Sequence, residues 1–269
     1  MLRWAYKHRM KRKDVFVLRK YLLLSGLALV LLGGCSKQDN PSSREAKAKQ
    51  SSAISTSQKE ASTSEKATSK KEEVKPMKVL EAVTEKKNLS EIEKSIKAGQ
   101  SDINERNAKG ESPLLIATHE NNVALAQLLI DNGADVNLQD HIQDSPYLYA
   151  AAQGKTEILR YILQHSKPNQ KVYNRFGGNA LIPAAEKGHL ENVKLLLKDG
   201  RVDIDHQNNY GYTALIEAVA LRDGSAHYQE IVKTLLQYKA NTELRDNNNL
   251  TALDYAKQLG YSGMINLLS

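Results

Sequence analysis

The chain has 269 residues, seven histidines, one cysteine and a formal net charge of +7. The first 34 residues hold eight Lys/Arg and one Asp, whereas residues 35–269 hold 30 basic and 30 acidic residues. A neutral body gives no electrostatic footprint for a nucleic-acid partner, and a single cysteine excludes an intrachain disulfide.

Residues 1–34 predict a secretory signal peptide. A basic segment, residues 3–20, precedes a short apolar run, residues 21–32. This is the layout of an export signal, and the run is shorter than the roughly 20 apolar residues that a membrane-spanning helix needs. Met10 is a second candidate for the first residue, because three basic residues follow it directly.

The apolar run ends in a short motif, Leu32-Gly33-Gly34-Cys35. This motif resembles the lipobox of bacterial lipoproteins, in which an aliphatic residue and two small residues precede a cysteine. The resemblance implies that the Cys35 thiol accepts a diacylglyceryl group and that Cys35 becomes the first residue of the mature chain. We therefore expect a lipid anchor at Cys35 that holds the protein on the extracytoplasmic side of the cell membrane. The alternative is an uncleaved membrane anchor with a buried cysteine.

Residues 35–76 predict a disordered tether that follows the lipidated cysteine. Ser, Thr, Lys, Glu, Ala and Gln dominate this segment, and it has no aromatic residue. Such a composition cannot bury enough apolar surface to offset the entropy lost on folding. As a flexible coil the tether would reach roughly 35 Å, which would hold the next domain away from a membrane surface.

A turn motif recurs through residues 77–269: a small or proline-containing turn, a leucine or tyrosine, two residues and an alanine. Its closing alanines are spaced 33, 34, 34 and 38 residues apart, at Ala117, Ala150, Ala184, Ala218 and Ala256. An amphipathic run with helical periodicity follows each motif, at residues 123–130, 156–163, 190–197, 229–236 and 262–268. The longest spacing implies an insertion near residues 222–227, which we expect to lengthen the turn between two helices.

The motif and its period resemble the ankyrin repeat, a unit of about 33 residues with two antiparallel helices. The resemblance implies an all-α solenoid of about six helix-turn-helix units over residues 77–269. The predicted units are 77–104, 105–137, 138–171, 172–205, 206–243 and 244–269. The first unit is degenerate, with helices expected near residues 78–84 and 89–97.

Two features of the family pattern bear on packing. The family usually has a histidine after the leucine of the turn motif, and here that position holds Leu115, Leu148, Ile182, Ile216 and Asp254. Apolar packing must therefore replace the hydrogen bonds of that histidine. His189 occupies the Gly-His step of the family, which favours a structural role over metal binding.

No catalytic constellation occurs in the sequence. The scattered histidines lack a metal-ligand spacing, and there is no phosphate-binding loop, dinucleotide fingerprint or nucleophile elbow. Asp203 and Asp205 are expected to cap turns between repeats. We predict no catalytic residue, metal, cofactor or small-molecule substrate, and hence no enzyme.

The resemblance implies that projecting hairpins and first helices bind another protein. The equivalent hairpin positions are Lys109, Ile142, Phe176, Tyr210 and Asn248. We predict an exposed apolar stripe formed by Ile142, Phe176 and Tyr210 and flanked by Arg175 and Tyr212, since aromatic and arginine side chains dominate interface hot spots. The alternative is that these side chains fold back onto neighbouring hairpins as packing.

These features favour a monomeric, membrane-anchored protein-binding module of the bacterial cell envelope. The main alternative is an immunity-type protein that neutralises a secreted toxin. The missing catalytic set argues against an enzyme that uses the repeats as a platform. The lipid anchor argues against an effector directed at a host cell.

Overall fold

The computed structural model describes residues 77–99 and 101–269, which form helices and loops and no β-strand. The predicted signal peptide, Cys35 and the tether lie outside these residues. The helices are α3 (Val79–Thr84), α4 (Leu89–Lys97), α5 (Pro113–His119), α6 (Val123–Asp131), α7 (Pro146–Ala152), α8 (Thr156–His165), α9 (Leu181–Glu186), α10 (Leu190–Asp199), α11 (Ala214–Ala220), α12 (Ala226–Gln237), α13 (Ala252–Leu259) and α14 (Ser262–Leu268).

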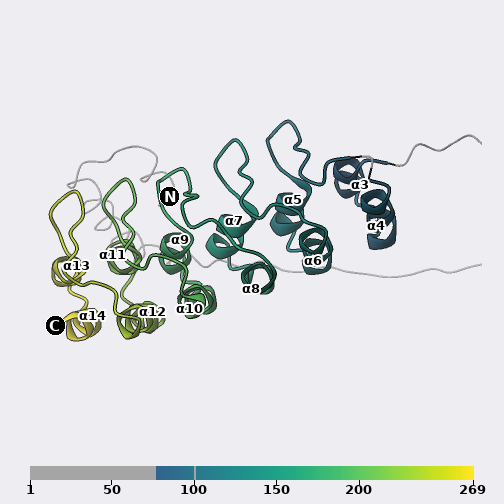
Figure 1. Ribbon diagram of the computed structural model, residues 1–269. Helices are drawn as coiled ribbons and strands as arrows, with labels where there is room; N and C mark the ends of the chain where they lie inside the picture. Colours follow the sequence, from purple (N-terminus) through teal and green to yellow (C-terminus); the bar gives the residue numbers. More distant parts are fainter. Residues whose placement is uncertain (1–76, 100) are drawn as a thin grey trace, which may run out of the picture. The chain divides into compact units, whose positions relative to one another are not determined.

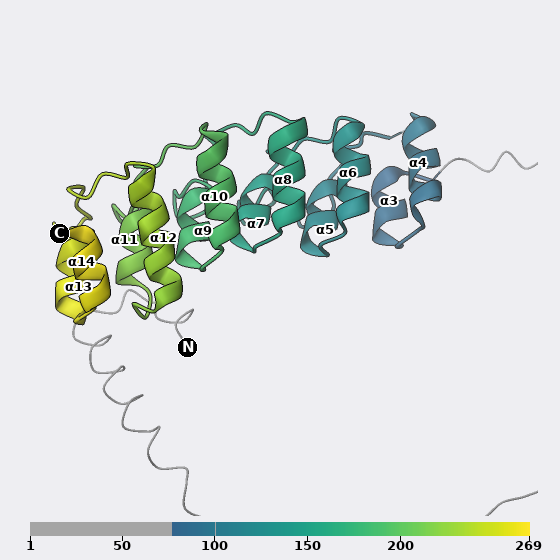
Figure 2. The same cartoon turned by 90° about the horizontal axis from the view of Figure 1, so that it is seen from below.

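The helices form two parallel rows. The first helix of each pair (α3, α5, α7, α9, α11 and α13) lies in one row and the second helix in the other (Figures 1 and 2). Long loops project from the side of the first-helix row, one before each pair from α5 onward (Figure 1). The predicted all-helical solenoid is confirmed, because each pair packs on the next and the chain runs steadily along the stack.

Side-chain caps fix where the first helices begin. Ser112, Ser145, Thr213 and Thr251 each accept a hydrogen bond from the backbone N–H three residues further on, at 3.1–3.2 Å. Proline follows the two serine caps, where its missing N–H costs nothing. In the degenerate first unit, Asn88 and Glu91 form a reciprocal capping box at the start of α4. The turn motif is therefore a helix-start signal.

The core runs along the whole stack between the two rows. The side chains that replace the family's histidine are buried at four positions, with 0–3% exposure for Leu115, Leu148, Ile182 and Ile216. Apolar packing takes the place of the histidine there, as expected. At the fifth position Asp254 is partly exposed and caps its own helix by accepting bonds from Thr251. Leu196, predicted to lie between helices, is fully buried.

The insertion does not only lengthen a turn. Two of its four residues precede Gly224, because the spacing from Ala218 to Gly224 is two residues longer than the equivalent spacing from Ala184 to Gly188. The other two follow Gly224, because the spacing from Gly224 to Ile231 is two residues longer than that from Gly188 to Val193. The first pair lengthens the loop before Gly224, and the second pair adds to the start of α12, which is 12 residues long compared with 10 for α10. The expectation of a longer turn alone was wrong, because residues after Gly224 continue a helix.

A buried side-chain amide joins two consecutive repeats. The side chain of Asn192 on α10 is fully buried and donates from Nδ2 to the carbonyls of Ala150 and Ala151, at 3.0 and 3.1 Å. These carbonyls belong to the last turn of α7, where helical carbonyls lack an intrahelical partner. Asn192 thereby donates hydrogen bonds to carbonyls at the C-terminal end of a helix in the preceding repeat.

Candidate functional site

The five projecting loops share one geometry. In each loop an Asn or Asp side chain accepts backbone N–H bonds from the residues two and four positions further on, at 2.8–3.0 Å. These residues are Asn107, Asp140, Asn174, Asn208 and Asp246. An Asn or Asp that bonds its own loop in this way closes a tight turn. Each loop is therefore a rigid hairpin in which the backbone N–H groups of the turn are hydrogen-bonded within the loop.

Backbone hydrogen bonds also join neighbouring hairpins. His141 donates to the Lys109 carbonyl at 3.1 Å, Asn209 to the Phe176 carbonyl at 2.9 Å and Asn247 to the Tyr210 carbonyl at 3.1 Å. This close approach explains the turn glycines. At Gly177, which has a φ of +75°, a Cβ atom would lie 2.2 Å from Asn209 Oδ1 and 3.2 Å from its backbone nitrogen.

One junction departs from this pattern. The Ile142 carbonyl accepts a 3.4 Å bond from Arg175 Nη1, a side-chain group, where the other junctions use a backbone N–H. The turn position of that hairpin holds Gln143, which keeps the left-handed conformation with a φ of +62°. Where a backbone N–H bonds to the tip carbonyl of the preceding hairpin, the two backbones are too close for a Cβ atom at the turn position. The bond from the Arg175 side chain leaves room for the Cβ atom of Gln143.

The structure places the predicted stripe residues at or beside the hairpin ends. Ile142 is 56% exposed and Tyr210 is 43% exposed, so both side chains face solvent. Phe176 and Tyr212 are partly buried, and Arg175 is exposed. Two groups result: Ile142 with Arg175 and Phe176, and Tyr210 with Tyr212, whose ring centroids lie 6.4 Å apart. That the two groups act as one recognition surface stays a prediction.

Arg175 holds the first group together through three contacts. Its guanidinium lies 5.0 Å from the centroid of the Phe176 ring, and its Nη1 atom lies 3.6 Å from Asp144 Oδ1. The third contact is the bond to the Ile142 carbonyl. Burial raises the pKa of the Asp144 carboxyl, and the positive charge of Arg175 opposes that rise. Arg175 therefore stabilises the packing of this group, although its side chain is exposed.

Tyr212 is directed toward the next helix pair. Its ring meets the ring of Tyr255 on α13 edge to face, with centroids 6.2 Å apart, and the two hydroxyls are 3.4 Å apart. Tyr255 also donates to the buried Asp246, and burial together with this bond raises the pKa of its phenol. Tyr212 thus belongs to the face formed by the first helices more than to the hairpin ends.

Sequence reasoning missed several hairpin residues. The Tyr173 ring is stacked on His206, with centroids 4.4 Å apart, and its side chain is partly exposed. Arg106 and Arg245 precede the turn-forming Asn107 and Asp246 and are both exposed. The position just before each turn-forming Asn or Asp could have indicated these residues, because it recurs in the sequence as regularly as the tip position does.

The first-helix face contains a buried carboxyl group. Glu217 on α11 is 3% exposed and accepts a 2.8 Å bond from Asn208 Nδ2. Burial raises its pKa to about 8, and the negative charge of Glu186 adds to this rise. Glu186 itself pairs with Arg222, which follows α11. The group is a protonated, hydrogen-bonded part of the packing near neutral pH and has no exposed surface for catalysis.

The histidine of the Gly-His step has a packing role. The His189 ring covers Gly154 of the preceding repeat, where a Cβ atom would lie 2.7 Å from its Nδ1. Burial lowers the pKa of His189, and Lys187 lowers it further. Among residues 77–99 and 101–269, no group of three or more His, Cys, Asp or Glu side chains could hold a metal ion.

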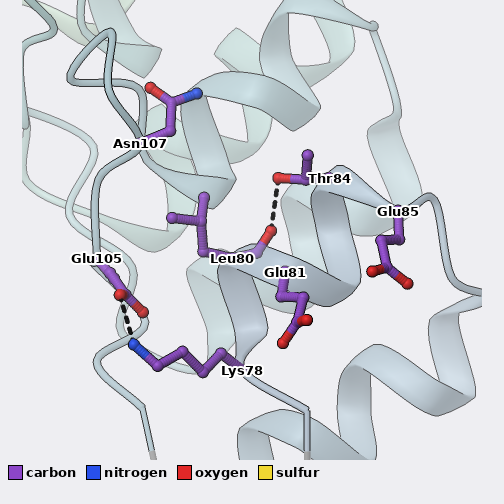
Figure 3. A pocket seen from close by; sticks show the side chains of 7 residues that line it. All are labelled: Lys78, Leu80, Glu81, Thr84, Glu85, Glu105 and Asn107. Carbon is purple, nitrogen blue, oxygen red and sulfur yellow. Dashed lines mark hydrogen bonds and ion pairs between the residues drawn. The ribbon is translucent and has the colours of Figure 1, made fainter.

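A pocket lies at the N-terminal end of the described stack (Figure 3). Lys78 forms a 2.8 Å ion pair with Glu105 across it; Glu81 lies on α3, and Glu85 directly follows that helix (Figure 3). The other lining residues are Leu80, Thr84 and Asn107. The bond to Glu105 raises the pKa of the Lys78 amine.

Comparison with known proteins agrees with this architecture. The family profile described as ankyrin repeats in three copies matches residues 80–173 and 149–246. The ankyrin repeat protein YahD of Escherichia coli is 38% identical over 167 residues, which cover 62% of this chain and 83% of YahD. The chain belongs to the ankyrin repeat family.

Solved structures of ankyrin repeat proteins are also similar to this chain. The crystal structure of EF0377, an ankyrin repeat protein, has 51% identity and a TM-score of 0.69, and the match covers 72% of this chain and 97% of EF0377. An ankyrin repeat domain from Acinetobacter baumannii AYE has 45% identity and a TM-score of 0.66, with 71% and 95% of the two chains covered.

Membership of this family defines the general activity. Ankyrin repeats mediate protein–protein interaction, and proteins built from them are typically non-enzymatic binding modules. Of the helices in the described residues, none is both long and apolar enough to cross a membrane.

Proposed function

We propose that this chain is a lipid-anchored protein-binding module of the bacterial cell envelope. The support for binding through the hairpins is the exposure of Ile142 and Tyr210 on rigid loops, with Phe176 stacked under Arg175 between them. Exposed apolar and aromatic side chains on a preorganised backbone lose little entropy when a partner binds. This is the observation that carries the proposal.

The support for the anchor comes from the sequence. The lipobox-like motif ends at Cys35, the only cysteine of the chain, after a basic segment and a short apolar run. Residues 35–76 would then link the lipid to the repeats. The folded domain carries a near-neutral charge, so its attachment to a membrane would depend on the lipid.

Capture of partners from solubilised membranes tests the binding proposal. Tagged full-length protein should retain a specific partner, and Phe176→Ala should weaken that capture by about tenfold or more, as expected for a hot spot. Lys198→Ala serves as the control, because Lys198 is exposed on α10 in the second-helix row. Equal capture by the two variants would contradict a role for the hairpins.

Metabolic labelling with a palmitate analogue tests the anchor. The natural chain should carry the label, and Cys35→Ser should lose it and accumulate as an unprocessed precursor. An equally labelled Cys35→Ser chain would rule out lipidation at this cysteine.

A further inference from the structure

The exposed charged residues of the hairpins are basic. We call the five segments 106–110, 139–143, 173–177, 207–211 and 245–249 the hairpin ridge. The ridge contains four Lys/Arg side chains, all exposed: Arg106, Lys109, Arg175 and Arg245. By contrast, residues 77–269 as a whole have 21 basic and 24 acidic residues. The ridge is therefore cationic on an otherwise slightly acidic domain.

The acidic residues of the ridge do not offset these charges at its surface. Only Asp140 and Asp246 are acidic, and they are 8% and 5% exposed. Both carboxylates are turned inward, where they accept the backbone N–H bonds that close their own hairpins. An approaching molecule thus meets arginine and lysine side chains and no exposed carboxylate within the five segments.

The contacts of Arg106 and Arg245 leave most of their charge available, whereas Arg175 pairs with Asp144. Arg106 donates to the neutral carbonyl of Gln139, at 3.3 Å. Arg245 donates to the carbonyl of Asn249 and lies 3.5 Å from the half-exposed Asp254. Bonds to neutral carbonyls do not cancel a guanidinium charge, and exposed ion pairs at such distances contribute little. The ridge keeps a positive potential that favours an anionic partner.

The backbone of the ridge restricts how a partner can bind. The carbonyls of Lys109, Phe176 and Tyr210 already accept bonds from the next hairpin, and the tip amides bond to Asn or Asp side chains. Addition of a strand to the ridge would need unused backbone groups. Recognition must therefore come from side chains, which are cationic, aromatic or aliphatic.

We infer that the ridge binds an extended acidic segment of a partner protein, in which carboxylates alternate with apolar or aromatic side chains. Packed repeats lie about 10 Å apart, and an extended chain advances about 3.3 Å per residue, so roughly every third residue would face a hairpin. Carboxylates would pair with Arg106, Lys109 and Arg245, and apolar side chains would contact Ile142 and Tyr210. This inference rests on the proposed protein-binding function and specifies the partner's chemistry.

Two other anionic partners fit the ridge less well. Duplex DNA has one charge per about 1.7 Å along its axis, whereas the ridge offers about one cation per hairpin. A membrane surface would gain little from insertion, because Phe176 is partly covered and the sixth repeat presents Asn247, Asn248 and Asn249. Both are included as outcomes of the test.

The test uses full-length protein in detergent and a fluorescent peptide of about 15 residues in which glutamate alternates with phenylalanine or leucine at every third position, the positions that face successive hairpins. A matched peptide with lysine in place of glutamate is the probe control. Charge reversal of the ridge combines Arg106→Glu, Lys109→Glu and Arg245→Glu. The matched control reverses three exposed cations of the second-helix row: Lys94→Glu, Lys198→Glu and Lys233→Glu.

We expect the acidic peptide to bind, and its affinity to fall about tenfold or more in the ridge variant and less than about twofold in the control variant. Unchanged melting temperatures would show that both variants fold. Preference for the lysine peptide, equal loss in both variants, or binding only to duplex DNA or to phosphatidylglycerol micelles would overturn the inference. If charge reversal spares membrane-partner capture while Phe176→Ala abolishes it, the inference fails and the proposed function stands.

Discussion

Replacing Glu217 with glutamine should stabilise the protein at pH 8 and change its stability little at pH 4.5. The folded structure buries this carboxyl beside Asn208 and raises its pKa from 4.5 to about 8. The folded state therefore holds the proton more tightly than the unfolded chain does. The stability that Glu217 contributes is full below pH 4.5 and is lost as the pH rises to about 8.

The size of this effect follows from the pKa values. A tenfold difference in proton affinity corresponds to about 1.4 kcal/mol, so a rise from 4.5 to about 8 sets an upper limit of about 5 kcal/mol on the loss. The value of about 8 already includes the charge of Arg222, which favours the ionised form. We expect Glu217→Gln to raise the free energy of unfolding by about 2–3 kcal/mol at pH 8, since glutamine keeps the acceptor for Asn208 without a charge.

Urea unfolding followed by the helical circular dichroism signal measures this difference at pH 4.5, 6 and 8. Glu191→Gln is the control, because Glu191 is an exposed glutamate on α10 and should leave the pH dependence unchanged. His189, whose pKa is lowered, acts in the opposite direction, and comparison of the two proteins at each pH removes its contribution. A glutamine variant less stable than the natural chain at pH 8 would contradict the raised pKa of Glu217, because the fold would then favour the carboxylate over a neutral side chain.

Three further substitutions test the packing. Leu196→Ala should cost about 2–5 kcal/mol in urea unfolding, because the side chain is fully buried; a cost below about 0.5 kcal/mol would contradict its place in the core. Gly177→Ala should lower the melting temperature more than Gly133→Ala, since both have positive φ but only Gly177 meets the next hairpin; equal effects would refute the close approach. Asn192→Ala should cost about 1–3 kcal/mol, because the Ala151 carbonyl loses its bond from Asn192 while the Ala150 carbonyl keeps one from the Lys155 N–H; a neutral result would argue against the bond to Ala151.

Much of the fold could be predicted from the sequence because each repeat states its own boundaries. The second helices expected at residues 190–197 and 262–268 are observed as Leu190–Asp199 and Ser262–Leu268. Apolar periodicity and a following glycine or small residue define such helices independently of their neighbours. The start of α12 was missed, because the added residues Ala226 and His227 continue no apolar pattern.

The details of the candidate site were harder to predict, because they depend on contacts between repeats. The exposure of Ile142 and Tyr210 followed from their place in the turn motif. The pairing of Tyr212 with Tyr255 joins residues 43 positions apart, and no local pattern encodes it. The raised pKa of Glu217 likewise comes from burial and from the charge of Glu186, 31 positions away, and no local pattern encodes either.

The link between Ile142 and Arg175 makes the row of hairpins mechanically uneven. The other described junctions include a backbone N–H bond between hairpins, whose strength barely changes with salt. This junction combines a 2.8 Å bond from Gln139 Nε2 to the Tyr173 carbonyl with the long charged side chain of Arg175 and its 3.6 Å pairing with Asp144. Salt screens such a pair and leaves amide bonds intact. Under tension or at high ionic strength the row should therefore yield first between its second and third hairpins, so that the stack behaves as two stiff segments with one compliant joint.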